Sequence, residues 1–196
     1  MASQVRCPVE TSYDRMRKVM VIGSSGAGKS TFSQRLGAIL NLEVVHLDSI
    51  HWRPGWVKPE KAVWVRIQEE LIAKNSWILD GNYGSTLEIR MRACDTVVYL
   101  AFPRMLCLYR VTKRWLQYRG RSRVDLNPGC VEHMPDWEFI SWIWEFPKKK
   151  APGVLALLEK YREGRQVIVL KSPRELERFL MRVKEEGRNH SVSTGE

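Results

Sequence analysis

The sequence predicts an α/β protein in which helices cover both faces of a five-stranded parallel sheet. Short apolar runs rich in β-branched residues recur along the chain, separated by stretches whose apolar residues have helical spacing. This alternation is typical of parallel sheets, because each crossover helix returns the chain to the same edge of the sheet. A length of 196 residues, with 44% hydrophobic and 28% charged residues, suits one globular domain.

The expected elements follow from these patterns in chain order. The expected strands cover residues 18–22, 43–47, 77–79, 96–100 and 166–170. The expected helices cover 31–40, 59–74, 104–118, a segment through Trp142 to 161, and 173–185. We expect a flexible leader at 1–17, a single domain at 18–186 and a disordered polar tail at 187–196.

The composition disfavours several function classes. No apolar run approaches a membrane span and the N-terminus lacks a signal-peptide core, so the expected location is the cytoplasm. The cysteines show neither disulfide-type nor zinc-type spacing and are expected to be reduced thiols; they are Cys7, Cys94, Cys107 and Cys130. The net charge of +10 suits polyanionic partners such as nucleotides or nucleic acid, and equally a generally basic surface.

The most informative stretch is a glycine-rich loop between the first expected strand and the first expected helix. It fits the phosphate-loop pattern G-x-x-x-x-G-K-[ST] and reads Gly23, Ser24, Ser25, Gly26, Ala27, Gly28, Lys29 and Ser30. Glycines let the backbone fold around an anion with successive N–H groups pointing inward, and the helix N-terminus adds partial positive charge. A plain glycine-rich turn is the alternative, but the flanking strand and helix favour a nucleotide phosphate site.

Two side chains of this loop have defined expected roles. Lys29 is expected to reach the β- and γ-phosphates of ATP, and the Ser30 hydroxyl is expected to ligate Mg²⁺. Thr31, where the helix starts, completes the expected nucleotide-binding stretch. The predicted cofactors are therefore ATP and Mg²⁺.

Two aspartates are predicted to share one edge of the sheet with the phosphate loop. Ligands of open parallel sheets bind at the carboxyl ends of the strands, where Asp48 follows the second expected strand and Asp80 the third. Asp80 is expected to support Mg²⁺, with an Asp-Gly turn as the alternative. Asp48 is expected to contact the acceptor or take its proton, with a helix or turn cap as the alternative. His46 is expected to be satisfied within the fold.

Arginines are concentrated between residues 104 and 124, a stretch without acidic residues. Arg110 and Arg114 share one face of the expected helix, while Arg119 and Arg123 lie in the loop that follows. Arginines over a phosphate site neutralise the charge of the transferring group, so we predict a lid at about 110–136 and an acceptor-binding segment at about 48–74. A solvated helix face and a nucleic-acid patch are the alternatives.

These pieces together resemble the small-molecule kinases of the adenylate-kinase type. The strand that ends in Asp80-Gly81 resembles the strand ending in Asp-Gly in that family, and the arginine helix with its loop resembles the lid segment. The resemblance implies a three-layer α/β/α P-loop NTPase fold with a small lid. It also implies that Ser172 and Pro173, after the fifth expected strand, meet the adenine ring.

The chain departs from true adenylate kinases at one informative place. They carry Phe-Pro-Arg after the Asp-Gly pair, whereas this chain has Asn82 and Tyr83, so the acceptor-binding arginine is missing there. Arg90 and Arg92 are the candidate replacements.

A more detailed resemblance, over about residues 18–180, is to the bacterial DNA topology modulation proteins (FlaR-like), an adenylate-kinase-related group. It rests on Leu47-Asp48 with Trp52 to Trp56, on residues 80–86, on Gly129-Cys130 with Glu132, and on residues 142–147. The reaction of this group is poorly defined, so the resemblance implies a kinase-like fold and leaves the acceptor open.

Two functions follow from the sequence. The first is an ATP- and Mg²⁺-dependent phosphotransferase that moves the γ-phosphoryl group to a nucleotide, nucleoside or other small metabolite. The second is a nucleotide-regulated nucleic-acid-binding protein that affects DNA topology or gene expression. We expect a monomer or dimer without membrane association.

Overall fold

A five-stranded parallel sheet forms the centre of the molecule, as predicted. The computed structural model describes residues 16–122 and 126–193, and within them the strand order is β2-β3-β1-β4-β5. The strands are β1 (Lys18–Gly23), β2 (Val44–His46), β3 (Trp77–Asp80), β4 (Thr96–Leu100) and β5 (Gln166–Leu170). Every pairing is parallel, so the carboxyl ends of all five strands meet at one edge.

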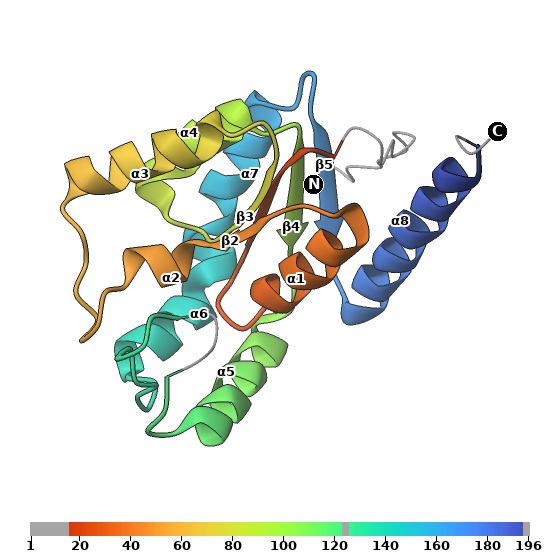
Figure 1. The fold of residues 1–196 in the computed structure, drawn as a ribbon. Coiled ribbons are helices and arrows are strands. Elements are labelled where there is room, and N and C mark those ends of the chain that lie inside the picture. The colour runs from red at the N-terminus through yellow and green to blue at the C-terminus, as the bar shows by residue number, and fades with distance from the viewer. Residues whose placement is uncertain (1–15, 123–125, 194–196) are drawn as a thin grey trace.

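Helices cover both faces of this sheet (Figure 1). They are α1 (Lys29–Leu40), α2 (Leu47–His51), α3 (Lys61–Ala73), the 3₁₀ turn η2 (Gly84–Thr86), α4 (Leu87–Ala93), α5 (Arg104–Tyr118), α6 (Trp137–Lys149), α7 (Ala151–Lys160) and α8 (Pro173–Ser193). In the part of the chain that the structure describes, none of the helices combines the length and apolar composition that a membrane span needs.

The alternation of side chains along β1 divides the core into two layers. Val19 and Val21 pack in one hydrophobic cluster with Phe32 of α1 and Phe179 of α8. Met20 and Ile22, which point to the other face, belong to a second cluster that includes residues of α4 and α7. A strand buried on both faces reads as a continuous apolar run, which is why the sequence predicted it so clearly.

Three predicted boundaries differ from the structure. The second strand ends at His46, because the Ser49 hydroxyl donates to the His46 carbonyl and the chain turns into α2. The helix predicted to continue to residue 161 is two helices, since Pro152 has no N–H to extend the hydrogen bonds of α6. The last helix continues to Ser193 instead of ending near 185, although residues from Gly187 onward are mostly of low helix propensity.

The sequence prediction also missed the short helical segment η2–α4 between β3 and β4. At the N-terminus, Met16 is buried and the backbone N–H of Arg17 donates to Asp95 Oδ2 at 3.0 Å, so the end of the predicted leader packs on the domain. Residues 1–15 of that leader lie outside the described part of the chain.

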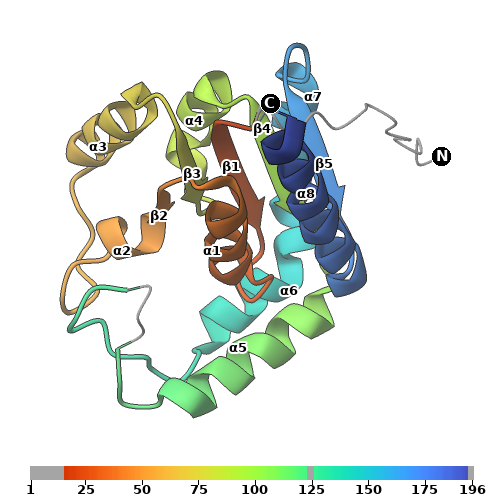
Figure 2. The same cartoon turned by 45° about the vertical axis from the view of Figure 1, so that its right-hand side comes forward.

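The carboxyl edge of the sheet is where the candidate site forms. Figure 2 shows α5 and α6 beyond this edge, with α1 and α8 side by side on one face of the sheet. The packing of α5 against α6 and of α1 against α8 is among the most extensive between helices. Loops after β1, β2, β3 and β5 therefore converge in a space bounded by α5.

Candidate active site

The phosphate loop joins β1 to α1 and is pressed against α5. Gly28 precedes α1 with a φ of 89°, and Gly26 has a φ of 78°. A Cβ atom on Gly26 would lie 2.3 Å from the Cys107 carbonyl oxygen, so glycine is required there by both backbone conformation and space. The Arg110 guanidinium fixes the same loop by donating from Nη1 to the Ala27 carbonyl at 3.0 Å.

Lys29 lies at the centre of this loop with its ammonium turned inward. Its Nζ donates to the carbonyls of Gly23 at 3.1 Å and Ser24 at 3.2 Å. Burial lowers the pKa of Lys29, and the charges of Asp48 and Asp80 oppose that shift. The ammonium is thus a desolvated cation at the phosphate loop, within the electrostatic reach of two carboxylates.

A cavity of about 330 Å³ opens in front of the loop. The predicted residues that line it are Ser25, Gly26, Ala27, Gly28, Lys29, Ser30, Thr31, Asp48, Arg110, Arg114 and Pro173. Four lining residues were not predicted, namely Phe32, Arg35, Leu176 and Glu177. The first two loop residues, Gly23 and Ser24, lie behind the lining, and Ser24 instead borders a smaller cavity of about 130 Å³.

Asp48 reaches the cavity from the first turn of α2, not from the end of a strand. Its Oδ1 accepts a hydrogen bond from the Tyr83 hydroxyl at 2.6 Å. The ring of Tyr83 packs against His51 and Trp64, with ring centroids 4.4 and 4.9 Å apart. The structure therefore brings Asp48 and the phosphate loop to one cavity, as the sequence predicted.

Asp80 ends β3 beside the phosphate loop and is buried. In the strand register it is the partner of Val21 in β1, two residues before the loop begins at Gly23. Its Oδ2 pairs with His46 Nδ1 at 2.8 Å, which confirms that His46 is satisfied within the fold. Asp80 does not line the cavity wall, but its charge acts on Lys29.

The four predicted arginines occupy different environments. Arg110 and Arg114 line the cavity from one face of α5, and Arg114 Nε donates to Glu132 Oε1 at 2.8 Å. Arg119 is exposed, lies outside the cavity lining and packs its guanidinium over Trp115. Arg123 lies outside the described residues. The sequence treated the four as equivalent, whereas among the three that the structure describes Arg110 and Arg114 line the cavity and Arg119 does not.

Hydrogen bonds join the residues that follow α5 to the segment that follows β2. Asn127 Nδ2 donates to the carbonyls of Ser49 at 2.6 Å and Trp52 at 2.7 Å. Trp56 Nε1 donates to the Val131 carbonyl at 3.0 Å, and the buried thiol of Cys130 contacts the Arg53 carbonyl. Parts of the predicted lid and of the predicted acceptor segment are therefore joined in this structure. The cysteines in the described part of the chain are free thiols, as predicted.

Neither candidate replacement for the missing acceptor arginine reaches the cavity. Arg90 is fully buried and donates to the carbonyls of Gly81 and Asn82, each at 2.8 Å, and of Tyr83 at 3.3 Å. Arg92 is exposed and pairs with Glu88 on the far side of α4. The hydrogen bonds of Arg90 hold the backbone of the loop after β3, so its guanidinium is directed away from the cavity that the phosphate loop and Asp48 share.

The loop after β5 contributes Pro173 to the cavity, and Ser172 supports it from outside the lining. Ser172 Oγ accepts from the Glu175 N–H at 3.3 Å, as an N-cap residue does. At the cavity edge, Arg35 of α1 and Glu177 of α8 form a bidentate ion pair, with Nη2 to Oε2 at 2.7 Å.

The chain is similar to the shikimate kinase from Acinetobacter baumannii in complex with shikimate, with a TM-score of 0.56 and 17% identity over 94% of this chain and 98% of that chain. It is similar to the shikimate kinase from Bacteroides thetaiotaomicron, with a TM-score of 0.51 and 18% identity over 85% of this chain and 95% of that chain. These two kinases therefore share the fold of this chain. No protein-family model and no curated protein sequence matches the chain.

Proposed function

We propose that this chain is an ATP- and Mg²⁺-dependent phosphotransferase that acts on a hydroxyl group of a small acceptor. The observation that carries the proposal is the shared cavity, in which the phosphate loop, two arginines and the carboxylate of Asp48 meet. A loop that only holds a nucleotide has no need of a carboxylate across from its lysine. A kinase does, because the acceptor hydroxyl must be oriented and must lose its proton.

The residues of the donor end fit a nucleotide triphosphate. Gly26 admits no side chain, Gly28 has a positive φ, and the N-terminus of the 12-residue helix α1 points its N–H groups at the cavity. We assign phosphate binding to residues 23–31 and the adenine contact to the Ser172-Pro173 turn. Ser30 and Asp80 would hold Mg²⁺, a cation that prefers one or two protein oxygens together with waters and phosphates. Bound MgATP would supply the phosphoryl group and neutralise part of its charge.

At the acceptor end, the carboxylate favours a hydroxyl over a phosphate as the acceptor group. An acceptor phosphate next to Asp48 would bring two negative charges together, whereas a hydroxyl would donate a hydrogen bond to it. Arg110 and Arg114 would stabilise the charge of the transferring group, joined by Arg119 and Arg123 when the lid at about 110–136 closes. The shikimate kinase of the same fold is in complex with shikimate, and we propose a small molecule for this chain as well.

A screen of ATP consumption tests the proposal. Wild-type protein with MgATP is combined with polyols, sugars, nucleosides, hydroxy acids and nucleotides in turn, and we expect acceptor-dependent ADP formation with at least one hydroxyl compound. Lys29→Ala should lower this rate by at least about 100-fold, because it removes the cation aimed at the transferring charge. Lys74→Ala is the matched control, since Lys74 is exposed and pairs with Glu43. Equal rates for wild type and Lys29→Ala would contradict the proposal.

We also propose membership in the topology modulation group, on the motifs named above, and a cytoplasmic location.

The net charge of +10 and the absence of acidic residues along α5 favour a second candidate function, nucleotide-regulated nucleic-acid binding. Binding of duplex DNA that weakens steeply between 50 and 200 mM salt, roughly the range over which phosphate contacts are lost, would support it. Absence of DNA binding at low salt would remove it.

A further inference from the structure

The loop after β3 contacts both halves of the candidate site through two adjacent side chains. Asn82 bonds the phosphate loop twice, since its Oδ1 accepts from the Gly23 N–H at 3.0 Å and its Nδ2 donates to the Gly23 carbonyl at 2.6 Å. Tyr83, the next residue, donates its hydroxyl to Asp48 Oδ1 at 2.6 Å. The donor loop and the acceptor carboxylate are therefore linked through a single peptide unit.

The backbone of the Asn82-Tyr83 pair is strained, and hydrogen bonds hold it in place. Tyr83 has a φ of 27° and a ψ of 74°, and a non-glycine residue persists at positive φ only when its surroundings enforce it. Arg90 provides that enforcement, because its buried guanidinium donates to the carbonyls of three consecutive residues, 81 to 83. The N–H of Thr86 donates to the Tyr83 carbonyl as well, at 3.0 Å.

The side chain of Tyr83 is fixed as closely as its backbone. Its ring forms a cluster with the rings of His51 and Trp64, in which each pair of centroids lies within 4.9 Å. Burial and the adjacent charge of Asp48 raise the pKa of Tyr83 well above its usual range, so its hydroxyl stays a hydrogen-bond donor at physiological pH. A strained residue with a locked ring and a single directed donor fits a functional constraint better than core packing.

We infer that Tyr83 is a positioning residue that orients the Asp48 carboxylate toward the acceptor hydroxyl. Asn82, the residue before it, fixes the distance between that carboxylate and the phosphate loop. The inference rests on the proposed function. Because Tyr83 occupies Oδ1 of Asp48, Oδ2 is the oxygen presented to the acceptor. This hydrogen bond removes rotational freedom of the Asp48 carboxylate before the phosphoryl group is transferred. Loss of the hydrogen bond should therefore weaken the reaction with the acceptor and leave ATP binding intact.

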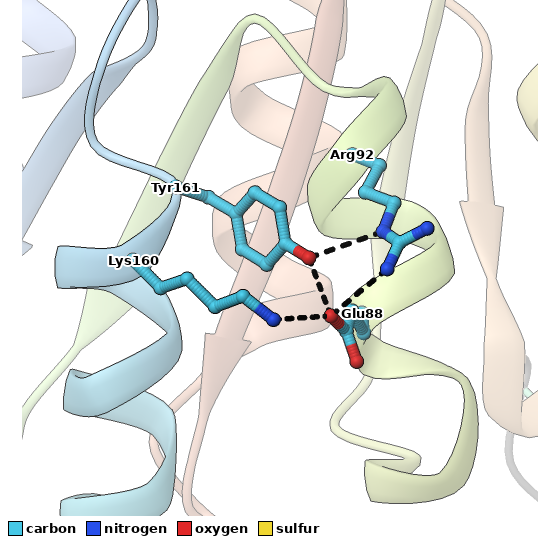
Figure 3. Close-up of polar contacts among 4 residues, drawn as sticks. All are labelled: Glu88, Arg92, Lys160 and Tyr161. Carbon is cyan, nitrogen blue, oxygen red and sulfur yellow. Dashed lines mark hydrogen bonds and ion pairs between the residues drawn. The ribbon is translucent and has the colours of Figure 1, made fainter.

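The chain contains a matched control for this hydrogen bond. Tyr161 at the end of α7 donates its hydroxyl to Glu88 Oε1 of α4, outside the cavity lining (Figure 3). Tyr161→Phe and Tyr83→Phe each remove one phenol that donates to a carboxylate. Only the second change lies in the candidate site.

The experiment compares steady-state kinetics of wild type, Tyr83→Phe and Tyr161→Phe with MgATP and the best hydroxyl compound of the screen panel. We expect Tyr83→Phe to lower kcat/KM for the acceptor by at least about tenfold while KM for ATP stays within about twofold. Tyr161→Phe should match wild type in both. Unchanged acceptor kinetics in Tyr83→Phe, or an equal loss for ATP and acceptor, would overturn the inference.

A double-mutant cycle with Asp48→Asn separates positioning from simple structural damage. If Tyr83 acts through Asp48, Tyr83→Phe has little further effect once Asp48 is changed, whereas additive losses contradict the inference. Should Tyr83→Phe fail to fold, Tyr83→Asn replaces it, because asparagine adopts positive φ readily, and the same kinetic pattern is required. If the wild type is active and Tyr83→Phe has the same kcat/KM for the acceptor, this inference is refuted and the proposed function is not. A wild type inactive across the panel refutes the proposed function, and the inference with it.

Discussion

The molecule contains two hydrogen bonds between a tyrosine hydroxyl and a carboxylate, in opposite kinds of environment. In the exposed seam between α4 and α7, Glu88 Oε1 accepts from Tyr161 and also from Lys160 at 2.8 Å and Arg92 at 3.2 Å (Figure 3). Lys160, Tyr161 and Arg92 together lower the pKa of Glu88 to about 2. In the site, Asp48 accepts from the half-buried Tyr83, and burial together with the charge of Asp48 raises the pKa of that phenol.

The difference shows what distinguishes a structural ion cluster from a site built for a ligand. The seam surrounds its carboxylate with donors from its own helix and from the end of α7, so the negative charge of Glu88 is compensated within the protein. The site holds a desolvated lysine and a carboxylate at a cavity of about 330 Å³, and a strained tyrosine behind the lining donates to that carboxylate. Groups arranged in this way are stabilised further by a bound anion or hydroxyl, which is the behaviour expected of an active site.

The largest expected contrast is in activity. Asp48→Asn should lower kcat by roughly 100- to 10,000-fold if Asp48 takes the acceptor proton. Glu88→Gln, the same change in the seam, should leave kcat at the wild-type value. Steady-state kinetics with the acceptor found in the screen provide the measurement. A wild-type kcat in Asp48→Asn would show that the carboxylate is only a contact.

The next contrast is in stability, between two arginines of α4. Arg90→Met should lower the free energy of unfolding by about 3 kcal/mol or more, because three buried carbonyls lose their donor. Arg92→Met, two residues further on and on the exposed face of α4, should leave the urea midpoint close to wild type. Equal midpoints for the two variants would contradict the role given to Arg90.

Replacing two glycines by alanine should change the free energy of unfolding by smaller amounts and in opposite directions. Gly26→Ala should destabilise by about 1–3 kcal/mol and abolish ATP binding, because the new Cβ meets the Cys107 carbonyl. Gly153→Ala in α7 meets no atom within 4 Å and should stabilise by about 0.5–1 kcal/mol through helix propensity. Thermal unfolding with and without ATP measures both effects. An unchanged ATP affinity in Gly26→Ala would contradict the loop geometry.

The smallest expected effect is the pH dependence of the seam. The folded pKa of Glu88, about 2, lies below its ordinary value of 4.5, so its stabilising contribution is present above pH 4.5 and is lost as the pH falls toward 2. The urea midpoint of wild type should therefore fall more than that of Glu88→Gln between pH 5 and pH 3. Parallel curves for the two proteins would show that the seam contributes nothing measurable.

The sequence predicted what is encoded locally. The strands read as apolar runs, and the phosphate loop, Asp48, Arg110 and Arg114 follow from spacing along single elements. The roles of Tyr83 and Arg90 depend on a loop whose backbone bends back on a buried guanidinium, and no periodic pattern signals that. The Asn-Tyr pair after Asp80-Gly81, where the resembled family carries an arginine, was the only sequence signal that pointed to this loop. The sequence did not distinguish Arg119 from Arg110 and Arg114, because its place just past the end of α5, outside the cavity lining, depends on tertiary packing.

The central claim is that a phosphoryl group passes from the loop end of the cavity to a hydroxyl at Asp48. Phosphorus NMR of wild-type protein with MgATP and the hydroxyl panel follows that group directly. The account predicts a new phosphate monoester resonance that grows in step with ADP and is absent with Lys29→Ala. ADP accompanied only by inorganic phosphate, across the whole panel, would contradict it.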